Sequence, residues 1–306
     1  MDFFSDLKNL VAGELTRRGI EFDPAAEVRE LILLVCNHEL KGIKPVKREV
    51  HTSTEFNAEL LKLAGQQQTA AKAIQQKFIQ GNDVNPHLGS QGNSSDNAGD
   101  VDQLLGEWGI YHIHISTHKK KPNDRFFART GPVIYAHVNA TDVYFIDIYP
   151  HGGWSRQKLL QIVNRTWPDL YKAARLDGAS LSVVVSDEDI KKLRGPTKTS
   201  KRPGAAITTS VQIGNSVLFP PGGGLAADGT PTMNVYRTLK TIRSVKKLEK
   251  LAAEKSSEWK SVISKDTNVP VEKLDFELVP LSPPGFGIRE KITGTMVYEM
   301  PEKKES

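Results

Sequence analysis

Alternating hydrophobic and polar positions are densest between residues 108 and 151, where the chain reads as three consecutive strands. Side-chain direction repeats every two residues in a strand, so the first of these runs places His112 and His114 on one face. The connection between the second and third runs, 139–141, is short, as is typical of a hairpin. The pattern therefore predicts an antiparallel meander with one polar, histidine-bearing face. The opposite face of the first run is the better candidate for the core: Tyr111, Ile113 and Ile115.

Strict alternation also assigns a face to each residue of the third run. Phe145, Asp147 and Tyr149 are expected to share one face of that strand, and Ile146 and Ile148 the other. Under this interpretation, neighbouring strands gather histidine, tyrosine and arginine side chains at one open surface of the sheet.

Hydrophobic residues at helical spacing dominate the beginning of the chain. They predict helices over residues 3–17, 24–39 and roughly 53–80. Residues 1–80 are therefore predicted to form a helical module with a scaffolding, regulatory or oligomer-contact role. The segment 81–101 is rich in Gly, Asn, Ser and Asp, and we interpret it as a linker because it can bury little hydrophobic surface.

The strand-like runs belong to a predicted central domain of residues 102–193. Within this domain, Ser155 can cap a helix that runs to Arg165, and Leu181–Val185 is long enough for one more strand. A basic segment interrupted by Pro and Gly follows at 194–206 and is predicted to be a second linker.

The last part of the chain, residues 207–306, begins with a strand-like segment at 207–219 and contains further strand-like segments between 271 and 299. A long helix is expected between them, because Thr230 can cap it and Pro231 suits its first turn. The predicted fold class is thus α+β: a helical N-terminal module, a central antiparallel sheet with helices, and a C-terminal α+β module with a long basic helix.

Composition limits the classes of protein that the chain can represent. The 306 residues are 38% hydrophobic and 25% charged, as in soluble globular proteins, and leave room for two or three domains. Cys36 is the only cysteine, which excludes an intrachain disulfide framework and a cysteine-based zinc site. The sequence has no long apolar run and no basic start typical of a signal peptide, so it predicts a cytoplasmic protein with no membrane partner.

Positive charge is concentrated in one region of the chain. Residues 187–260 contain 14 Lys or Arg and 7 Asp or Glu, a net charge of +7, whereas the whole chain carries +5. Such a region permits a polyanionic partner, and RNA is the partner that we expect. The candidate binding residues on the long helix are Arg237, Lys240 and Arg243.

The residues around the strand-like runs are suited to cleavage of RNA through its 2′-hydroxyl. This reaction needs a base, a donor or cation at the phosphate and an acid at the leaving oxygen, but no metal or cofactor. Imidazole titrates closest to neutral pH, so His112, His114 and His151 are candidates for the acid and the base. Arg129 is the candidate for the phosphate. Further candidates hold phosphates, stack on a base or donate a hydrogen bond: Lys119, Lys120, Lys121, Tyr135 and Tyr149.

The elements follow the order of a strand at Ile110–Ile115, a basic segment, the motif Arg-x-Gly-Pro with two hydrophobic residues and Tyr at Arg129–Tyr135, and a strand at Val143–His151. This order resembles that of the RelE/HigB-type toxin endoribonucleases, whose last strand ends in His or Lys, and the resemblance covers about residues 104–170. The resemblance implies a small α/β domain that cleaves mRNA, often on the ribosome, with Arg129 at the phosphate and Tyr149 or His151 near the leaving group. It also implies a toxin or phage-defence setting, with an inhibitor protein as a possible partner.

Two other interpretations fit the same sequence. The chain can be a non-catalytic nucleic-acid-binding or assembly module that uses the basic region 194–260, and Gly222–Gly224 can hold a phosphate on backbone N–H groups. Alternatively, His112 and His114 point the same way and can begin the site of a zinc-dependent hydrolase. The third zinc ligand would then be one of three neighbours: His137, Asp147 or His151.

Overall fold

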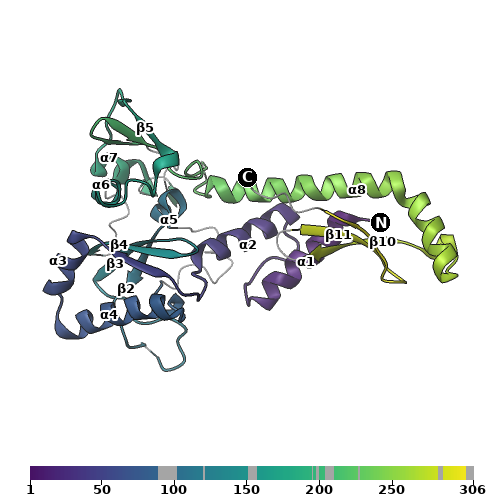
Figure 1. The fold of residues 1–306 in the computed structure, drawn as a ribbon, viewed down its shortest axis with the longest axis horizontal. Coiled ribbons are helices and arrows are strands. Elements are labelled where there is room, and N and C mark those ends of the chain that lie inside the picture. Colours follow the sequence, from purple (N-terminus) through teal and green to yellow (C-terminus); the bar gives the residue numbers. More distant parts are fainter. Residues whose placement is uncertain are drawn as a thin grey trace. The chain divides into compact units, whose positions relative to one another are not determined.

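The chain is a mixed α+β protein in a computed structural model, as the sequence predicts (Figure 1). It forms two compact units: residues 37–234, which we call the central unit, and residues 1–36 with 235–306, which we call the terminal unit. The structure describes residues 1–88, 102–119, 121–150, 157–194, 196–197, 200–203, 210–226, 228–281 and 285–300.

The central unit is built on a four-stranded sheet with the strand order β1-β4-β3-β2. Strands β2, β3 and β4 form the antiparallel meander that alternation predicts, and β1 adds a parallel edge strand beside β4. Helical spacing in the first 80 residues does not predict β1, because a strand of four residues has too short a pattern to be recognised. The strands are β1 (Glu49–Thr52), β2 (Ile110–His114), β3 (Pro132–Val138) and β4 (Asp142–Pro150).

Both faces of this sheet are covered by packed elements (Figure 1). Helices α3 (Thr54–Lys62) and α4 (Gly65–Gln80) bury one face, and α5 (Gln103–Trp108) and α6 (Gln157–Thr166) bury the other. The expectation of an open, polar face is therefore wrong. Four apolar side chains of α6 pack over the face that carries the histidines: Leu159, Leu160, Ile162 and Val163.

Strand β4 contains a bulge that changes the predicted faces. Tyr135 lies opposite Asp147 and the next residue of β3 lies opposite Phe145, so Ile146 is the additional residue. Phe145 therefore packs against α3 and α4, whereas Ile146, Asp147 and Tyr149 are on the face covered by α6. The expectation that Phe145 shares a face with Asp147 and Tyr149 is wrong, because strict alternation takes no account of bulges.

Residues 53–80, predicted as one helix, form two helices. Ser53 caps α3, because its Oγ accepts a hydrogen bond from the Phe56 N–H at 2.9 Å. Leu63 and Ala64 are extended, with ψ of 144° and 150°, and they separate α3 from α4. Hydrophobic spacing does not reveal this break because both helices bury their apolar faces in the same core.

The remainder of the central unit includes two small sheets and short helices. One predicted strand is absent: residues 181–185 are irregular, and Val183 and Val184 are exposed. The small sheet β5-β9-β8 packs on the α6 side, and β6 pairs with β7. These elements are η1 (Asn85–His87), η4 (Lys172–Ala174), β5 (Arg175–Asp177), α7 (Asp187–Arg194), β6 (Pro196–Thr197), β7 (Ser200–Pro203), β8 (Val211–Ile213) and β9 (Ser216–Leu218).

The terminal unit packs helices against the antiparallel sheet β10-β11-β12. The long basic helix is confirmed as α8 (Thr232–Thr267), and the strands predicted near the end of the chain are present. No helix among the described residues is long and apolar enough to cross a membrane. The other elements are α1 (Phe3–Arg17), α2 (Val28–Lys41), η5 (Val271–Lys273), β10 (Phe276–Leu281), β11 (Gly285–Glu290) and β12 (Met296–Glu299).

The two ends of the chain belong to one compact unit, and the limits between the units lie after residues 36 and 234. Composition predicts domain boundaries at other positions: 80, 101, 193 and 206. The Leu278 N–H donates a hydrogen bond to the Asp6 carboxylate at 2.9 Å, and Phe3 and Phe276 share one core. Linker-like composition indicates where a chain is irregular, but it contains no information on which distant segments pack together.

Ser53 offers a test of how the helix and the sheet are joined. Its buried Oγ also donates to the carbonyl oxygen of Ile146 at 2.5 Å, so it serves the α3 cap and the bulge together. We expect Ser53→Ala to lower the free energy of unfolding by about 2–3 kcal/mol, since a cap and a buried hydrogen bond are both lost. Urea denaturation measures this change, and the partly exposed Ser256→Ala on α8 should stay within about 0.5 kcal/mol of wild type.

Candidate functional site

Three side chains on the α6-covered face lie directly across from one another in neighbouring strands. Tyr135 of β3 is paired with His112 of β2 on one side and with Asp147 of β4 on the other. Side chains at such positions have Cβ atoms about 5 Å apart. We call these three residues the polar row; His114 and Tyr149 flank one residue of β3 in the next row. The structure thus brings together four residues of the predicted site: His112, His114, Tyr135 and Tyr149.

His112 is the half-buried member of the polar row. Its Nδ1 lies 3.1 Å from Oδ2 of Asp102, whose other carboxylate oxygen accepts the Leu105 N–H and caps α5. Burial alone would raise the pKa of Asp102, but the hydrogen bond and charge of His112, together with backbone N–H groups, hold this pKa below its usual value. A histidine oriented by a carboxylate in this way has the arrangement of a general base.

His114 and Tyr135, in contrast, are sealed in the core, with 1% and 2% of their surfaces exposed. The Thr130 N–H donates to Nδ1 of His114 at 3.2 Å, so a neutral His114 carries its proton on Nε2. The carbonyl oxygen of His114 in turn lies 3.2 Å from Nδ1 of His87, another buried histidine. Burial lowers the pKa of His87 to about 4. The burial of His114 and Tyr135 assigns them a structural role and keeps them from direct contact with a polymer.

Asp147 is the buried carboxylate of the polar row, with 1% of its surface exposed. Burial raises its pKa, although the Ile148 N–H donates to Oδ1 at 2.8 Å and Lys158 lies close enough to oppose the shift. Lys158 of α6 lies over the ring of Tyr149, 5.2 Å from its centroid, and the hydrogen bond with Tyr149 raises the pKa of Lys158. Sequence reasoning named Tyr149 but missed Lys158, because the helical pattern of α6 does not indicate which sheet residue it faces.

A basic loop, residues 117–130, connects β2 to β3. It contains five Lys or Arg and one Asp, and its side chains Lys119, Lys121 and Arg129 are exposed. The Phe127 N–H donates to the Pro86 carbonyl at 2.8 Å and joins the loop to the unit, and the Ala128 N–H donates to the His118 carbonyl at 2.9 Å and closes the loop on itself. Two other predicted site residues, Lys120 and His151, lie outside the described part of the chain.

The first half of α8 carries a second cationic surface. Five exposed residues with the spacing i, i+4, i+7, i+11 and i+14 form one stripe about 21 Å long on the helix. No Asp or Glu occurs between residues 232 and 248. The opposite side of α8, including Val245 and Leu248, packs in the core of the terminal unit. We call this surface the α8 stripe: Tyr236, Lys240, Arg243, Lys247 and Lys250. Arg237, also predicted to bind, is exposed beside it.

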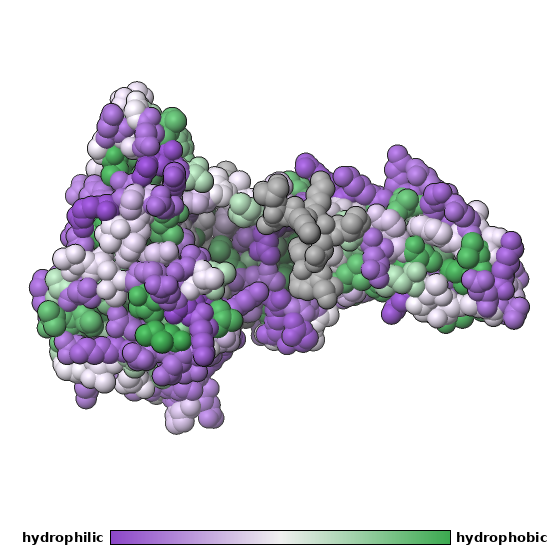
Figure 2. All heavy atoms as spheres, in the orientation of Figure 1, coloured by the Kyte–Doolittle hydropathy of each residue, from purple (hydrophilic) through white to green (hydrophobic). Residues whose placement is uncertain are grey.

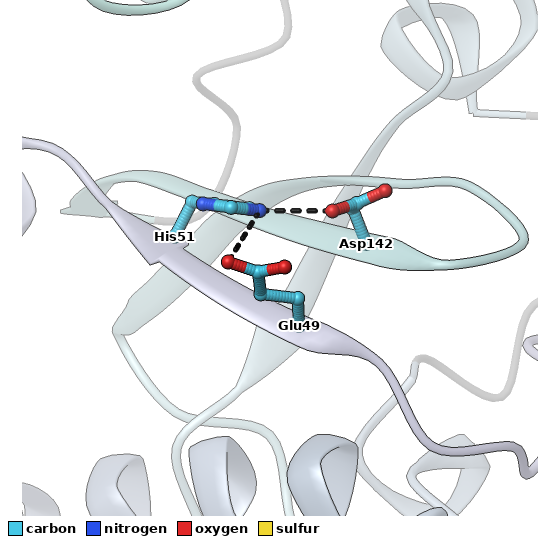
Figure 3. A group of neighbouring side chains, drawn as sticks. All are labelled: Glu49, His51 and Asp142. Carbon is cyan, nitrogen blue, oxygen red and sulfur yellow. Dashed lines mark hydrogen bonds and ion pairs between the residues drawn. The ribbon is translucent and has the colours of Figure 1, made fainter.

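One group of three potential metal ligands converges within the described residues, and it does not include His112 or His114. Glu49 and His51 of β1 lie beside Asp142 of β4, with one ligand atom of each within 4.8 Å of the others (Figure 3). Sequence reasoning missed this group because β1 was not predicted. No third described ligand joins His112 and His114, whose Nδ1 atoms face Asp102 and the Thr130 N–H.

Gly222–Gly224, considered as a phosphate site, forms a turn against the start of α8. All three glycines have positive φ, between 75° and 86°, which other residues rarely adopt. The Gly223 N–H is bonded to the Pro220 carbonyl, and the Gly224 carbonyl accepts the Thr232 N–H. The turn that these bonds form requires positive φ, and this requirement explains the three glycines without a bound phosphate.

Comparison with known proteins finds no match to this chain among protein-family models, curated proteins or solved structures. The resemblance to RelE/HigB-type toxins therefore stays a prediction from the residues and motifs quoted above. Function has to be inferred from the arrangement of side chains in each unit.

Asp147→Asn should show how burial of the carboxylate affects stability. Because the pKa of Asp147 is higher in the folded than in the unfolded protein, its charge costs stability above the folded pKa, and this cost disappears below the unfolded pKa of about 3.9. Asparagine avoids the charge, so we expect the variant to be more stable than wild type near pH 7 and its advantage to shrink toward about pH 4.

Urea midpoints at both pH values measure this effect. Asp169→Asn, a change of the same type at an exposed position, is the matched control. A difference between Asp147→Asn and wild type that is equal at the two pH values would contradict a role for the buried charge.

Proposed function

We propose that the protein binds RNA through exposed cationic surfaces. The α8 stripe carries this proposal: four cations and one tyrosine share a narrow exposed face of a helix whose first 17 residues contain no carboxylate. Phosphate contacts by Lys and Arg supply most of the sequence-independent affinity for nucleic acids. Tyr236, at the start of the stripe and 56% exposed, can stack on an unpaired base.

The basic loop of the central unit supports the same proposal independently. Its cations are interleaved with aromatic rings: Arg125 lies 5.5 Å from the ring centroid of Phe126, and Lys77 of α4 lies 5.7 Å from that of Phe127. Cations next to aromatic rings are typical of surfaces that bind single-stranded nucleic acid. Hydrophilic residues also cover most of the visible surface, with hydrophobic residues in small separate groups (Figure 2).

Neutralising part of the α8 stripe should weaken RNA binding. For Arg243→Gln with Lys247→Gln, we expect a several-fold loss of affinity for single-stranded RNA at low salt. The slope of log K against log salt should fall by about 0.7 for each phosphate contact that is lost. Fluorescence anisotropy across a salt series measures both quantities.

The second half of the same helix provides the matched control. Lys255→Gln with Lys265→Gln removes the same charge from exposed positions, but Lys255 is already paired with Glu258 at 2.8 Å. This variant should keep the affinity and slope of wild type. Equal losses in the two double variants would point to net charge alone, and a salt-independent wild type would exclude phosphate contacts.

A second candidate function, metal-independent endoribonuclease activity, is favoured by the pair of His112 and Asp102. In this proposal His112 is the general base, Arg129 contacts the phosphate, and Tyr149 with Lys158 or His151 serves the leaving group. A RelE-like toxin or phage-defence protein that acts on ribosome-bound RNA and is controlled by an inhibitor protein would fit this chemistry. The zinc-hydrolase alternative has less support, since no third ligand converges with His112 and His114 among the described residues.

Cleavage of RNA by the purified chain in the presence of a chelator is the expected result for this second candidate. His112→Ala should slow cleavage roughly 10²- to 10⁴-fold, the usual contribution of a general base, while RNA binding is kept. Glu272→Gln, at an exposed position outside both proposed RNA-binding surfaces, is the control and should cleave as wild type does. Activity that survives His112→Ala, or that requires added zinc, would reject the metal-independent mechanism and leave RNA binding as the function.

A further inference from the structure

Glu49, His51 and Asp142 point toward one another on the β1–β4 edge of the central sheet (Figure 3). The parallel register places Glu49 opposite Asp142, and His51 follows two residues later on the same face of β1. Nε2 of His51 lies 2.9 Å from Oδ1 of Asp142 and 4.0 Å from Oε1 of Glu49. Three different ligand groups from two strands therefore face a common point.

We propose that these three residues bind a divalent first-row transition metal ion, with Zn²⁺ as the simplest case. Zinc holds imidazole nitrogen and carboxylate oxygen at about 2.0–2.2 Å, so neighbouring ligands of a tetrahedral site lie about 3.4 Å apart. The two distances from Nε2 of His51, 2.9 and 4.0 Å, bracket this separation. One imidazole with two carboxylates suits zinc or manganese, whereas calcium and magnesium prefer oxygen ligands alone.

The surroundings of the cluster hold two of its ligands in place. The imidazole of His51 stacks on the ring of Tyr144, with 4.7 Å between centroids and 16° between planes. The second carboxylate oxygen of Asp142, Oδ2, accepts a hydrogen bond from the Thr141 hydroxyl at 2.5 Å, and the Asp142 N–H donates to Oδ1 of Asn139. Such fixed ligands lose little freedom when an ion binds, which favours affinity.

Glu49 distinguishes a metal site from an ordinary histidine–aspartate pair. Its side chain is 76% exposed, and an exposed charge 4.0 Å from His51 contributes little to an ion pair. As the third ligand of a zinc ion, however, the same carboxylate is essential. Three protein ligands would also leave one position for water or another small ligand.

Isothermal titration of the chelator-treated full chain with ZnCl₂ tests the proposal. We expect one zinc ion per chain and a loss of affinity of about tenfold or more in Glu49→Gln, in His51→Ala and in Asp142→Asn. Co²⁺ should give the visible absorption of tetrahedral coordination in wild type, and this signal should be lost in Glu49→Gln. Titrations with MgCl₂ and CaCl₂ are expected to show much weaker binding.

Two controls separate this site from adventitious binding by surface groups. His118→Ala and Glu272→Gln change an exposed histidine and an exposed glutamate elsewhere, and both should bind zinc as wild type does. Absence of zinc binding by wild type, or affinity unchanged in Glu49→Gln with an unchanged circular dichroism spectrum, would overturn the proposal. Glu49→Gln remains decisive even if His51→Ala fails to fold, because Glu49 is exposed.

Discussion

Strand β4 has a neighbouring strand on each edge and packed helices over each face, so its buried side chains from Phe145 to Ile148 must each fit one of two cores. The Ser53 hydroxyl donates a hydrogen bond to the carbonyl oxygen of Ile146, the additional residue at the bulge where the side chains of β4 change faces. Without the bulge at Ile146, Phe145 and Asp147 would share a face, and the carboxylate would lie among the aromatic rings of the α3 and α4 core. The bulge places Asp147 beside Tyr135 instead, and the cap of α3 is fixed by the same hydroxyl.

The polar row exists because the bulge places Asp147 beside Tyr135. The burial of these two residues limits which members of the row can take part in catalysis. Two of the row's three members, Tyr135 and Asp147, are buried and therefore cannot touch a polymeric substrate. Solvent reaches the row at His112, which Asp102 orients, and it reaches Tyr149 in the next row, where Lys158 lies over the ring. Chemistry on RNA would have to use these two partly exposed positions, while the buried members hold the strands in register. A cleaving enzyme built in this way would differ from one with an open histidine surface.

Elements with long periodic patterns could be predicted from the sequence, and features set by tertiary contacts could not. Alternation predicted the meander and the faces of β2 correctly, and a cap followed by an apolar stripe predicted α8. The cover over the histidine face, the bulge at Ile146 and strand β1 depend on packing between distant segments, which periodicity does not register. His112 was therefore found as a candidate, whereas Asp102 and the Glu49–His51–Asp142 cluster were missed, since their partners lie far away in sequence.

The two halves of α8 both carry exposed cations but differ in how these charges are arranged. In the second half, cations alternate with carboxylates and form pairs such as Lys255 with Glu258, which stabilise a helix slightly. In the first half, Arg243 has Lys240 and Lys247 as its nearest neighbours along the stripe, and like charges at these spacings destabilise a helix by about 0.2–0.5 kcal/mol per pair. Folding alone gives no reason to accept this repulsion when glutamate would remove it. A polyanion bound along the stripe, as we propose, would neutralise this repulsion.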